Sequence, residues 1–345
     1  MARVSVATVS RVMNASAVVQ EDTRLRVLEA ARELRFHPNG AARSLITQRT
    51  HAMGVILPDL YGEFFSELLR GMDQTAQRQG HHLLVSSSHH DSKGWNAAVR
   101  AMHGRVDGLL VMAPDVASAA LFDVLPANVP TVLLNGADIG TLPPGVSAIT
   151  VDNFAGARAM TRHLLALGHR RIGFIAGAER NVDAGARELG HRAELQAAGV
   201  SGGDELFVRG DFTEVGGRRA AGELLALREP PTAIFCANDA MAIGALSALR
   251  AASVDVPGQI AVVGFDDIPV AQFLNPPLTS VRVGIADLGE RAVTLLLHAL
   301  AERAPPQGDS HRVLSPELVV RGSCGPPAAP PASSPSRRAR RARVS

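Results

Sequence analysis

Apolar residues recur at two different periods along the chain, and the period changes near residue 50. Over residues 6–13 and again over 22–36, apolar side chains recur every three to four positions, which predicts two amphipathic helices. Pro38 ends the second of these helices. The following stretch, residues 39–45, has room for two helical turns but is too short and too polar to be stable alone. The chain therefore opens with a small all-α head.

From residue 52 onward, short runs rich in β-branched residues alternate with helical patterns. Nine of these runs predict strands that begin near residues 53, 82, 107, 130, 148, 171, 206, 232 and 260. Amphipathic patterns at 64–79, 154–168 and 239–252 predict helices between them. This alternation predicts parallel sheets with helices on both faces, and nine strands are many for one sheet. We therefore expect an α/β body of two domains.

Most of the predicted strands run directly into polar or small residues, such as LPD at 57–59, AND at 237–239 and FDD at 265–267. In open parallel sheets, ligands gather at the carboxyl ends of the strands. Two sheets whose strand ends face each other would form a cleft lined by these residues. The body is therefore expected to bind a small molecule.

Charge is distributed unevenly, although the net charge is only +2. Residues 1–50 carry eight arginines against four acids, and the last nine residues carry five arginines and no acid. The segment between them is therefore acidic. A basic head on an acidic body suits a module that binds a polyanion, attached to one that does not.

Composition excludes several classes of protein. The chain has no run of eighteen apolar residues and no apolar signal-peptide core, so we expect a cytoplasmic, nucleoid-associated protein without a membrane partner. Cys236 and Cys324 are expected to be free thiols. The tail from Gly325 is rich in Pro, Ala and Arg and is expected to be disordered.

Motifs that would indicate catalysis are missing from the sequence. It contains no Walker A or GxGxxG motif. The histidine pairs at 81–82 and 89–90 have no cysteine or suitably spaced acid beside them, so they are interpreted as surface residues and not as a metal site. Asp266 and Asp267 would point to opposite faces of a strand and make a poor acid–base pair. We expect no enzyme, no cofactor and no metal.

The head segment VSVATVSRVMNASAVVQEDTRLRVLEAARELRFHPNGAARSL, residues 4–45, resembles the DNA-binding head of lactose- and purine-repressor family regulators. The resemblance implies that the helix from Val6 enters the major groove. Val6, Ala7 and Arg11 would face base edges, and Thr8 and Ser10 would contact phosphates. The alternative for this helix is a solvated surface helix.

The string PNGAARSL at 38–45 resembles the hinge of the same family. The resemblance implies a hinge helix from Asn39 that pairs with its dimer mate in the minor groove. Leu45 would wedge between base steps there, and Arg43 would reach phosphates or the groove floor. The alternative is a flexible linker with an incidental leucine.

Family heads begin with a further helix and turn before the recognition helix. Met1 falls where that turn is expected, so we expect a head that lacks the first helix of its helix-turn-helix. Val9 and Val12 would then be partly exposed. Two explanations stay open: a misplaced start codon, or a truncated regulator that senses ligand but binds DNA poorly.

The body, residues 50–321, resembles the family's effector domain, which is similar to periplasmic sugar-binding proteins. The resemblance implies two doubly wound parallel-sheet subdomains with ligand between them, and chain crossings near Val151, Val281 and Arg312. The expected divisions are a head at 1–37, a hinge at 38–50, a first subdomain at 51–151 plus 282–311, a second at 152–281 plus 312–323, and a tail at 324–345.

The same resemblance assigns effector-binding residues by position. They are Phe64, Phe65, Asn135, Asn181, Asp183, Arg187, Asn238 and Asp266. Arg187 would bind ligand oxygens bidentately, whereas core packing is the alternative for Phe64 and Phe65. The stretch from Arg180 to Arg187 is one residue longer than in purine repressors, which leaves the register of Asn181 and Asp183 open. Asp239 and Asp267 are expected to cap the helices that follow them.

Together these features predict a homodimeric transcriptional repressor that binds double-stranded operator DNA under the control of a small polar effector, most simply a sugar. The tail lacks apolar heptads, so no coiled-coil tetramer is expected. The resemblance leaves open which ligand binds and whether it releases or promotes DNA binding. The alternative is a stand-alone sugar-binding protein, and an enzyme acting on sugars has no motif in its favour.

Overall fold

The computed structural model describes residues 2–13, 18–36, 49–90, 92–116, 118–136, 142–200, 203–302 and 311–326. The predicted hinge residues Asn39, Arg43 and Leu45 lie outside the described residues, as does the tail from residue 327. Cys236 and Cys324 are both free thiols. No described helix is long and apolar enough to cross a membrane.

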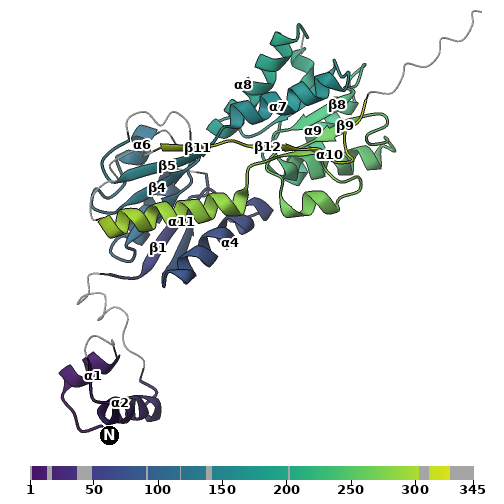
Figure 1. The fold of residues 1–345 in the computed structure, drawn as a ribbon. Coiled ribbons are helices and arrows are strands. Elements are labelled where there is room, and N and C mark those ends of the chain that lie inside the picture. Colours follow the sequence, from purple (N-terminus) through teal and green to yellow (C-terminus); the bar gives the residue numbers. More distant parts are fainter. Residues whose placement is uncertain are drawn as a thin grey trace, which may run out of the picture.

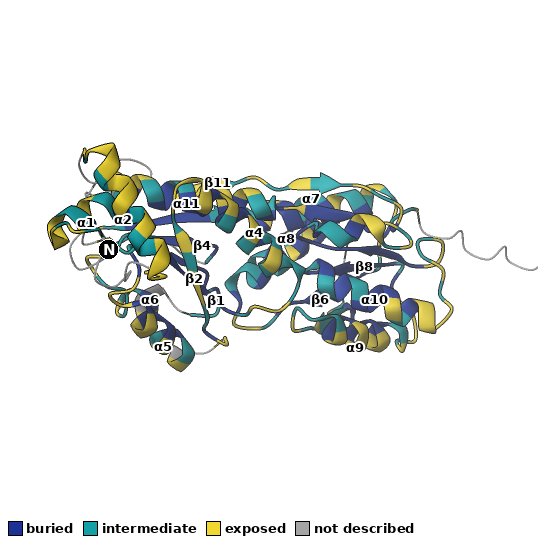
Figure 2. Cartoon of the chain, turned by 90° about the horizontal axis from the view of Figure 1, so that it is seen from below, coloured by how far each residue is buried: buried dark blue, intermediate teal, exposed yellow. Residues whose placement is uncertain are grey.

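The head contains the two predicted helices, α1 (Val6–Met13) and α2 (Glu21–Glu33). Helix α1 begins after Ser5, whose hydroxyl accepts a hydrogen bond from the amide of Thr8 at 3.2 Å. No residue of α1 is buried, and Val27 is the one buried residue of α2. Figure 2 shows this exposure as largely yellow helices. Such a head has little core of its own.

The first lobe is built on a six-stranded sheet in which every neighbouring pair is parallel, with the strand order β11-β5-β4-β3-β1-β2. Its strands are β1 (Ala52–Leu57), β2 (His82–Ser87), β3 (Gly108–Val111), β4 (Thr131–Leu134), β5 (Val146–Val151) and β11 (His311–Leu314). Its helices are α4 (Glu63–Arg78), α5 (Ser92–Met102), α6 (Ser118–Phe122) and α11 (Ile285–Glu302). In Figure 1, α4 and α11 lie side by side on this lobe, and their residues pack together.

The second lobe has a parallel four-stranded sheet of order β7-β6-β8-β9 and an antiparallel pair, β10-β12. The strands are β6 (Ile172–Ala176), β7 (Phe207–Arg209), β8 (Ala233–Cys236), β9 (Ala261–Val263), β10 (Ser280–Arg282) and β12 (Glu317–Val319). Two packed helix pairs accompany them, α7 (Asn153–Ala166) with α8 (Val182–Ala197), and α9 (Glu214–Leu225) with α10 (Asp239–Ala251). Short 3-10 turns span Asp204–Leu206 and Pro269–Phe273.

All nine predicted strands are present, and both sheets have the doubly wound α/β character that was expected. The strands that the hydrophobic pattern did not reveal are the short β10, β11 and β12. Each is only three or four residues long, and four of the seven residues in β11 and β12 are exposed. Strands with so little buried surface leave no alternation to detect.

The chain passes between the lobes three times, and the crossings set the boundary of the site. It leaves the first sheet after Val151 and returns to it after Arg282, close to the expected positions. The third crossing is later than expected. Arg312 lies within β11, paired with Ile149 of the first lobe, so the chain crosses only at residues 315–316.

Both lobes have continuous cores. Strands β3, β4, β6 and β8 are buried along their whole length, as in sheets that are covered on both faces. In Figure 2 the strands are dark blue between helices whose outer faces are yellow. The carboxyl ends of the strands point toward the space between the lobes, where the polar residues that follow them meet.

Candidate functional site

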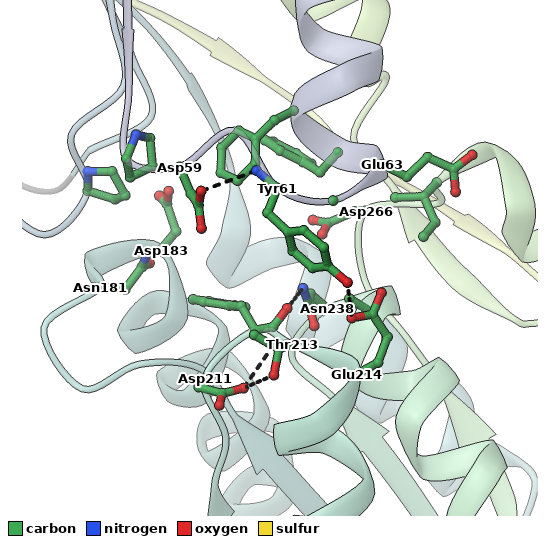
Figure 3. Close-up of a pocket in the computed structure, with 18 of the residues that line it drawn as sticks. Asp59, Tyr61, Glu63, Asn181, Asp183, Asp211, Thr213, Glu214, Asn238 and Asp266 are labelled. Carbon is green, nitrogen blue, oxygen red and sulfur yellow. Dashed lines mark hydrogen bonds between the residues drawn. The ribbon is translucent and has the colours of Figure 1, made fainter. Parts of the chain in front are cut away.

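A cavity of about 230 Å³ lies between the two lobes. All eight predicted effector residues line it: Phe64, Phe65 and Asn135 from the first lobe, and Asn181, Asp183, Arg187, Asn238 and Asp266 from the second. Figure 3 shows the polar side chains converging on this space from both lobes. Concave sites of this kind, with a few polar groups among aromatic ones, are typical of small-molecule binding.

Arg187 on α8 is held at the base of the cavity from several sides. Its Nε donates to Asn153 Oδ1 at 2.8 Å, and its Nη1 donates to the carbonyl oxygen of Ala237 at 2.6 Å. Its Nη2 lies 3.2 Å from Asp266 Oδ1, and the guanidinium covers the ring of Phe265 at 3.9 Å. A buried guanidinium with so many partners has one orientation, which prepares it to bind a ligand oxygen.

Gly190, one turn after Arg187, explains how α8 comes close enough to α7. A Cβ on Gly190 would lie 2.4 Å from the carbonyl oxygen of Phe154 at the start of α7. Any larger residue would push the two helices apart. The spacing Arg187-x-x-Gly190 therefore places the guanidinium within reach of Asn153.

Asp183 and Asp266 share this one guanidinium. Burial raises the pKa of each carboxyl to about 6, and the positive charge of Arg187 only partly offsets that effect. Asp183 accepts a hydrogen bond from Asn153 Nδ2 at 3.0 Å and another from the backbone amide of Gly136 in the first lobe. The single positive charge of Arg187 is therefore not enough to compensate for the burial of both carboxyls.

Asn181 and Asn238 have a structural task besides lining the cavity. Each is the N-cap of a helix: Asn181 Oδ1 accepts from the amide of Ala184 at 3.0 Å, and Asn238 Oδ1 accepts from that of Met241 at 2.9 Å. Asn238 Nδ2 also donates to the carbonyl oxygen of Phe212 at 3.1 Å. Capping therefore fixes both side-chain amides where they line the cavity.

The expectation that Asp239 and Asp267 are helix caps is wrong. Asp239 is fully buried and accepts hydrogen bonds from Ile268 N at 2.9 Å and Ser280 Oγ at 2.6 Å, which joins α10 to the crossover strands. Asp267 forms ion pairs with Arg282 at 2.8 Å and Arg321 at 2.6 Å. Both carboxylates tie long-range segments together, which a local capping rule does not foresee.

The first lobe contributes rings and an amide. Phe64 and Phe65 lie edge to face with their centroids 5.4 Å apart at the start of α4, and both are half-buried. They face the cavity and also pack against the core, so their two interpretations are not exclusive. Asn135 follows β4 and accepts a hydrogen bond from Val151 N at 3.2 Å.

Four cavity residues other than glycine adopt positive backbone φ angles: 57° at His90, 48° at Asn135, 67° at Phe212 and 108° at Asp266. Such conformations cost free energy for residues with a Cβ, and they collect at functional sites. The hydrogen bonds of Asp266 N to Val281 and of Asn135 N to Ile149 hold the chain in place. The backbone is therefore shaped around the cavity at some cost.

Contacts across the cleft connect the lobes around its rim. Tyr61 Oη donates to Glu214 Oε2 at 3.4 Å, Val270 N donates to Glu63 Oε2 at 3.3 Å, and Val182 N donates to the carbonyl oxygen of Pro114 at 3.2 Å. Figure 3 shows Tyr61 reaching across to Glu214. These few hydrogen bonds bridge lobes that otherwise meet at the cavity.

Several residues at the site were not predicted from the sequence. They include the buried positioning residue Asn153 and the cavity-lining residues Asp59, Tyr61, Glu63, His90, Asp211, Phe212, Thr213 and Glu214. The sequence analysis had marked LPD at 57–59 as a polar strand end without selecting a residue. His90, interpreted as a surface histidine, is exposed but stands at the cavity rim, where a 2.7 Å hydrogen bond to Asp115 raises its pKa. Within the described residues, no three His, Cys, Asp or Glu side chains are placed to hold a metal ion.

The residues of α1 that were predicted to contact DNA lie on an open surface. Val6, Ala7, Ser10 and Arg11 are exposed, while Thr8 is half-buried and shares a 2.9 Å hydrogen bond with Ser5. Val9 and Val12 are half-buried. An exposed face with an arginine and short side chains is suited to a DNA groove.

A basic helical head joined to a two-lobed body with a polar cavity defines a class: regulators that couple a small-molecule site to DNA. Residues 1–39 match the family described as bacterial regulatory proteins, lacI family, and residues 161–324 match the periplasmic binding protein-like domain. The HTH-type transcriptional regulator GalR of Escherichia coli K12 is 36% identical over 333 residues, covering 95% of this chain and 94% of that protein. The chain belongs to the lacI family of transcriptional regulators.

Two solved structures extend the similarity to three dimensions. A complex of the transcriptional regulator CelR with cellobiose has a TM-score of 0.71 at 32% identity, covering 93% of this chain and 97% of that one. The lac repressor dimer bound to operator and the anti-inducer ONPF has a TM-score of 0.82 at 29% identity, covering 94% and 96%. Head and body are thus both matched.

Proposed function

We propose that this protein is a transcriptional repressor whose dimer binds operator DNA and whose affinity for that DNA is set by a sugar in the cavity. The observation that carries the proposal is the convergence of eight residues from both lobes on one cavity, with Arg187 fixed at its base. A ligand that contacts both lobes changes the free energy of closing them, and only such a differential effect can shift a conformational equilibrium.

For the head, we propose that Val6, Ala7 and Arg11 read base edges and that Thr8 and Ser10 contact phosphates. For the hinge, Asn39, Arg43 and Leu45 keep the minor-groove role that the sequence predicts. The dimer follows from the two-fold symmetry of operators and from the dimeric lac repressor match. The alternative is a stand-alone sugar-binding protein. Such a protein would have no function for the exposed helix α1 and its Arg11.

The test is fluorescence anisotropy with labelled duplexes from the gene's own upstream region, at fixed salt because phosphate contacts make affinity salt-dependent. We expect specific binding by the wild type and a loss of about 1–3 kcal/mol in Arg11→Ala. A sugar panel should change operator affinity in the wild type but not in Arg187→Met. Binding no stronger than to random DNA would contradict the proposal.

A further inference from the structure

The charge of the cavity lining is strongly one-sided. Six carboxyl side chains line it from both lobes: Asp59, Glu63, Asp183, Asp211, Glu214 and Asp266. The cationic side chains among the described lining residues are Arg187 and, when protonated, His90. A neutral polyol needs hydrogen-bond partners but not an excess of four negative charges.

Neither of these two cations neutralises the excess of negative charge in the cavity lining. The hydrogen bonds of Arg187 go to Asn153 and Ala237, and its ion pair goes to Asp266. His90 Nδ1 is 2.7 Å from Asp115, which is not part of the lining, and its Nε2 is 4.0 Å from Asp59. Asp183, Asp211 and Glu214 form no ion pair with a cation among the described residues.

Asp266 gives an independent sign of a missing partner. It is 5% exposed, and its Oδ1 accepts no hydrogen bond within the described part of the chain, although Arg187 lies 3.2 Å away. Burying a carboxylate oxygen without a hydrogen bond costs free energy. Asp183 stands near the same arginine, and the pKa of both carboxyls is raised to about 6. A donor with positive charge, placed between them, would relieve both.

The aromatic lining describes the rest of the ligand. Phe64, Phe65, Tyr61 and Phe212 line the same cavity as the carboxylates, and the Phe64 and Phe65 rings meet edge to face. Rings of this kind suit the C–H face of a sugar, and they also attract cations. The amides of Asn135 and Asn181 lie at the same cavity and can serve hydroxyl groups.

We propose that the ligand of this cavity is a sugar with a free amino group, bound as its ammonium ion beside Asp183 and Asp266. This assignment rests on the proposed sugar-controlled function and adds the charge of the ligand to it. The ammonium donates to the unsatisfied oxygen of Asp266, and the hydroxyls bind to the amides. Sugar phosphates and sugar acids are rejected, because their charge has the same sign as the lining.

Calorimetry with matched sugars tests the charge directly. The probes are glucose, glucosamine and N-acetylglucosamine, with the galactose and mannose series alongside and glucose 6-phosphate as the anion. In at least one series the amine should bind about tenfold tighter than its neutral twin, as a charge-assisted hydrogen bond requires. Acetylation should remove that advantage. Neutral sugars that bind as tightly as their amines in every series, or no binding in any series, would overturn the proposal.

Variants locate the effect. Asp183→Asn keeps the acceptor oxygen for Asn153 but removes the charge, and should lower the preference for the amine by about tenfold. Asp59→Asn lies on the exposed rim and cannot disturb the core. It should lower the preference for the amine by about twofold. Glu223→Gln is the matched control, since Glu223 is exposed on α9 and outside the lining. An amine preference unchanged in both Asp variants would contradict the assignment.

The two proposals fail in different ways. A neutral sugar that changes operator affinity while its amine does not would leave the repressor function standing and overturn the charge assignment. A protein that binds no operator but still prefers amines in calorimetry would contradict the repressor function and support the charge assignment.

Discussion

The two lobes contribute unlike halves to one cavity. The second lobe supplies groups that are already held in place: the buried Arg187, which is ion-paired with Asp266, and the helix caps Asn181 and Asn238. The first lobe supplies residues near the surface: Tyr61 is 66% exposed, and the Asp59 side chain is 46% exposed. We therefore expect the second lobe's part of the site to be fixed before a ligand binds, and the exposed first-lobe residues Asp59 and Tyr61 to adjust to it.

This difference has an energetic meaning. Interactions that are fixed in advance cost little ordering entropy on binding, so the second lobe supplies affinity. Exposed side chains with few contacts move at little cost, so the first lobe supplies the response. Variants in the two halves should therefore affect stability very differently.

The largest effect is expected from Arg187→Met, which removes the charge at the base of the second lobe. It leaves Asn153, Ala237 and Asp266 without their partner, and breaking a buried pair costs about 3–5 kcal/mol of unfolding free energy. Urea denaturation measures this loss. The exposed Arg219→Met on α9 is the matched control and should lose less than about 1 kcal/mol. Equal losses in both variants would show that the second lobe is not the preformed half.

A second variant pair examines the fully buried Asp239, whose pKa burial raises well above its ordinary value. Asp239→Ala leaves Ile268 N–H and Ser280 O–H unsatisfied and should cost about 1–3 kcal/mol. Asp239→Asn keeps the volume and one acceptor oxygen, and it removes a carboxyl whose ionised form is disfavoured by burial, so it should cost much less. Thermal unfolding of the two variants checks this order, and an asparagine variant as unstable as the alanine one would contradict it.

Asp183→Asn should stabilise the ligand-free protein at pH 7–8. The folded pKa of about 6 lies above the ordinary value of 3.8, so the folded state binds more protons between these values and burial of the charge is unfavourable above pH 6. The gain, on the order of 1 kcal/mol, should shrink as the pH falls from 6 toward 3.8. Denaturation at pH 7.5 and pH 4.5 measures both ends, and a gain that grows on acidification would refute it.

The smallest effect is expected from Tyr61→Phe on the first lobe. The lost hydroxyl contact to Glu214 is long and exposed, so unfolding free energy should change by less than about 0.5 kcal/mol. Ligand dissociation should become about twofold faster, because one bridge across the cleft is gone. Stopped-flow measurements follow the release, and a large loss of stability would place Tyr61 in the fixed half.

Nine of the strands could be predicted because buried strands have a plain hydrophobic pattern. The eight residues that line the cavity could be located because the family resemblance assigns them by position. The rim could not be predicted. Tyr61, Glu63 and Glu214 belong to turns and helix starts whose periodicity says nothing about which lobe they face. Asp239 and Asp267 were assigned to caps because a local rule cannot see their partners, Ile268, Ser280, Arg282 and Arg321, which come from other segments.

Asp266 and Asp267 are neighbours in the chain, with φ angles of 108° and 55°, yet their carboxylates belong to different parts of the molecule. Asp266 faces the cavity, while Asp267 holds Arg282, just before the chain enters the first lobe, and Arg321, just after it has returned. The peptide unit between Asp266 and Asp267 therefore connects the cavity to two of the three segments that join the lobes. We expect a ligand that rotates this unit to move the segments around Arg282 and Arg321 together.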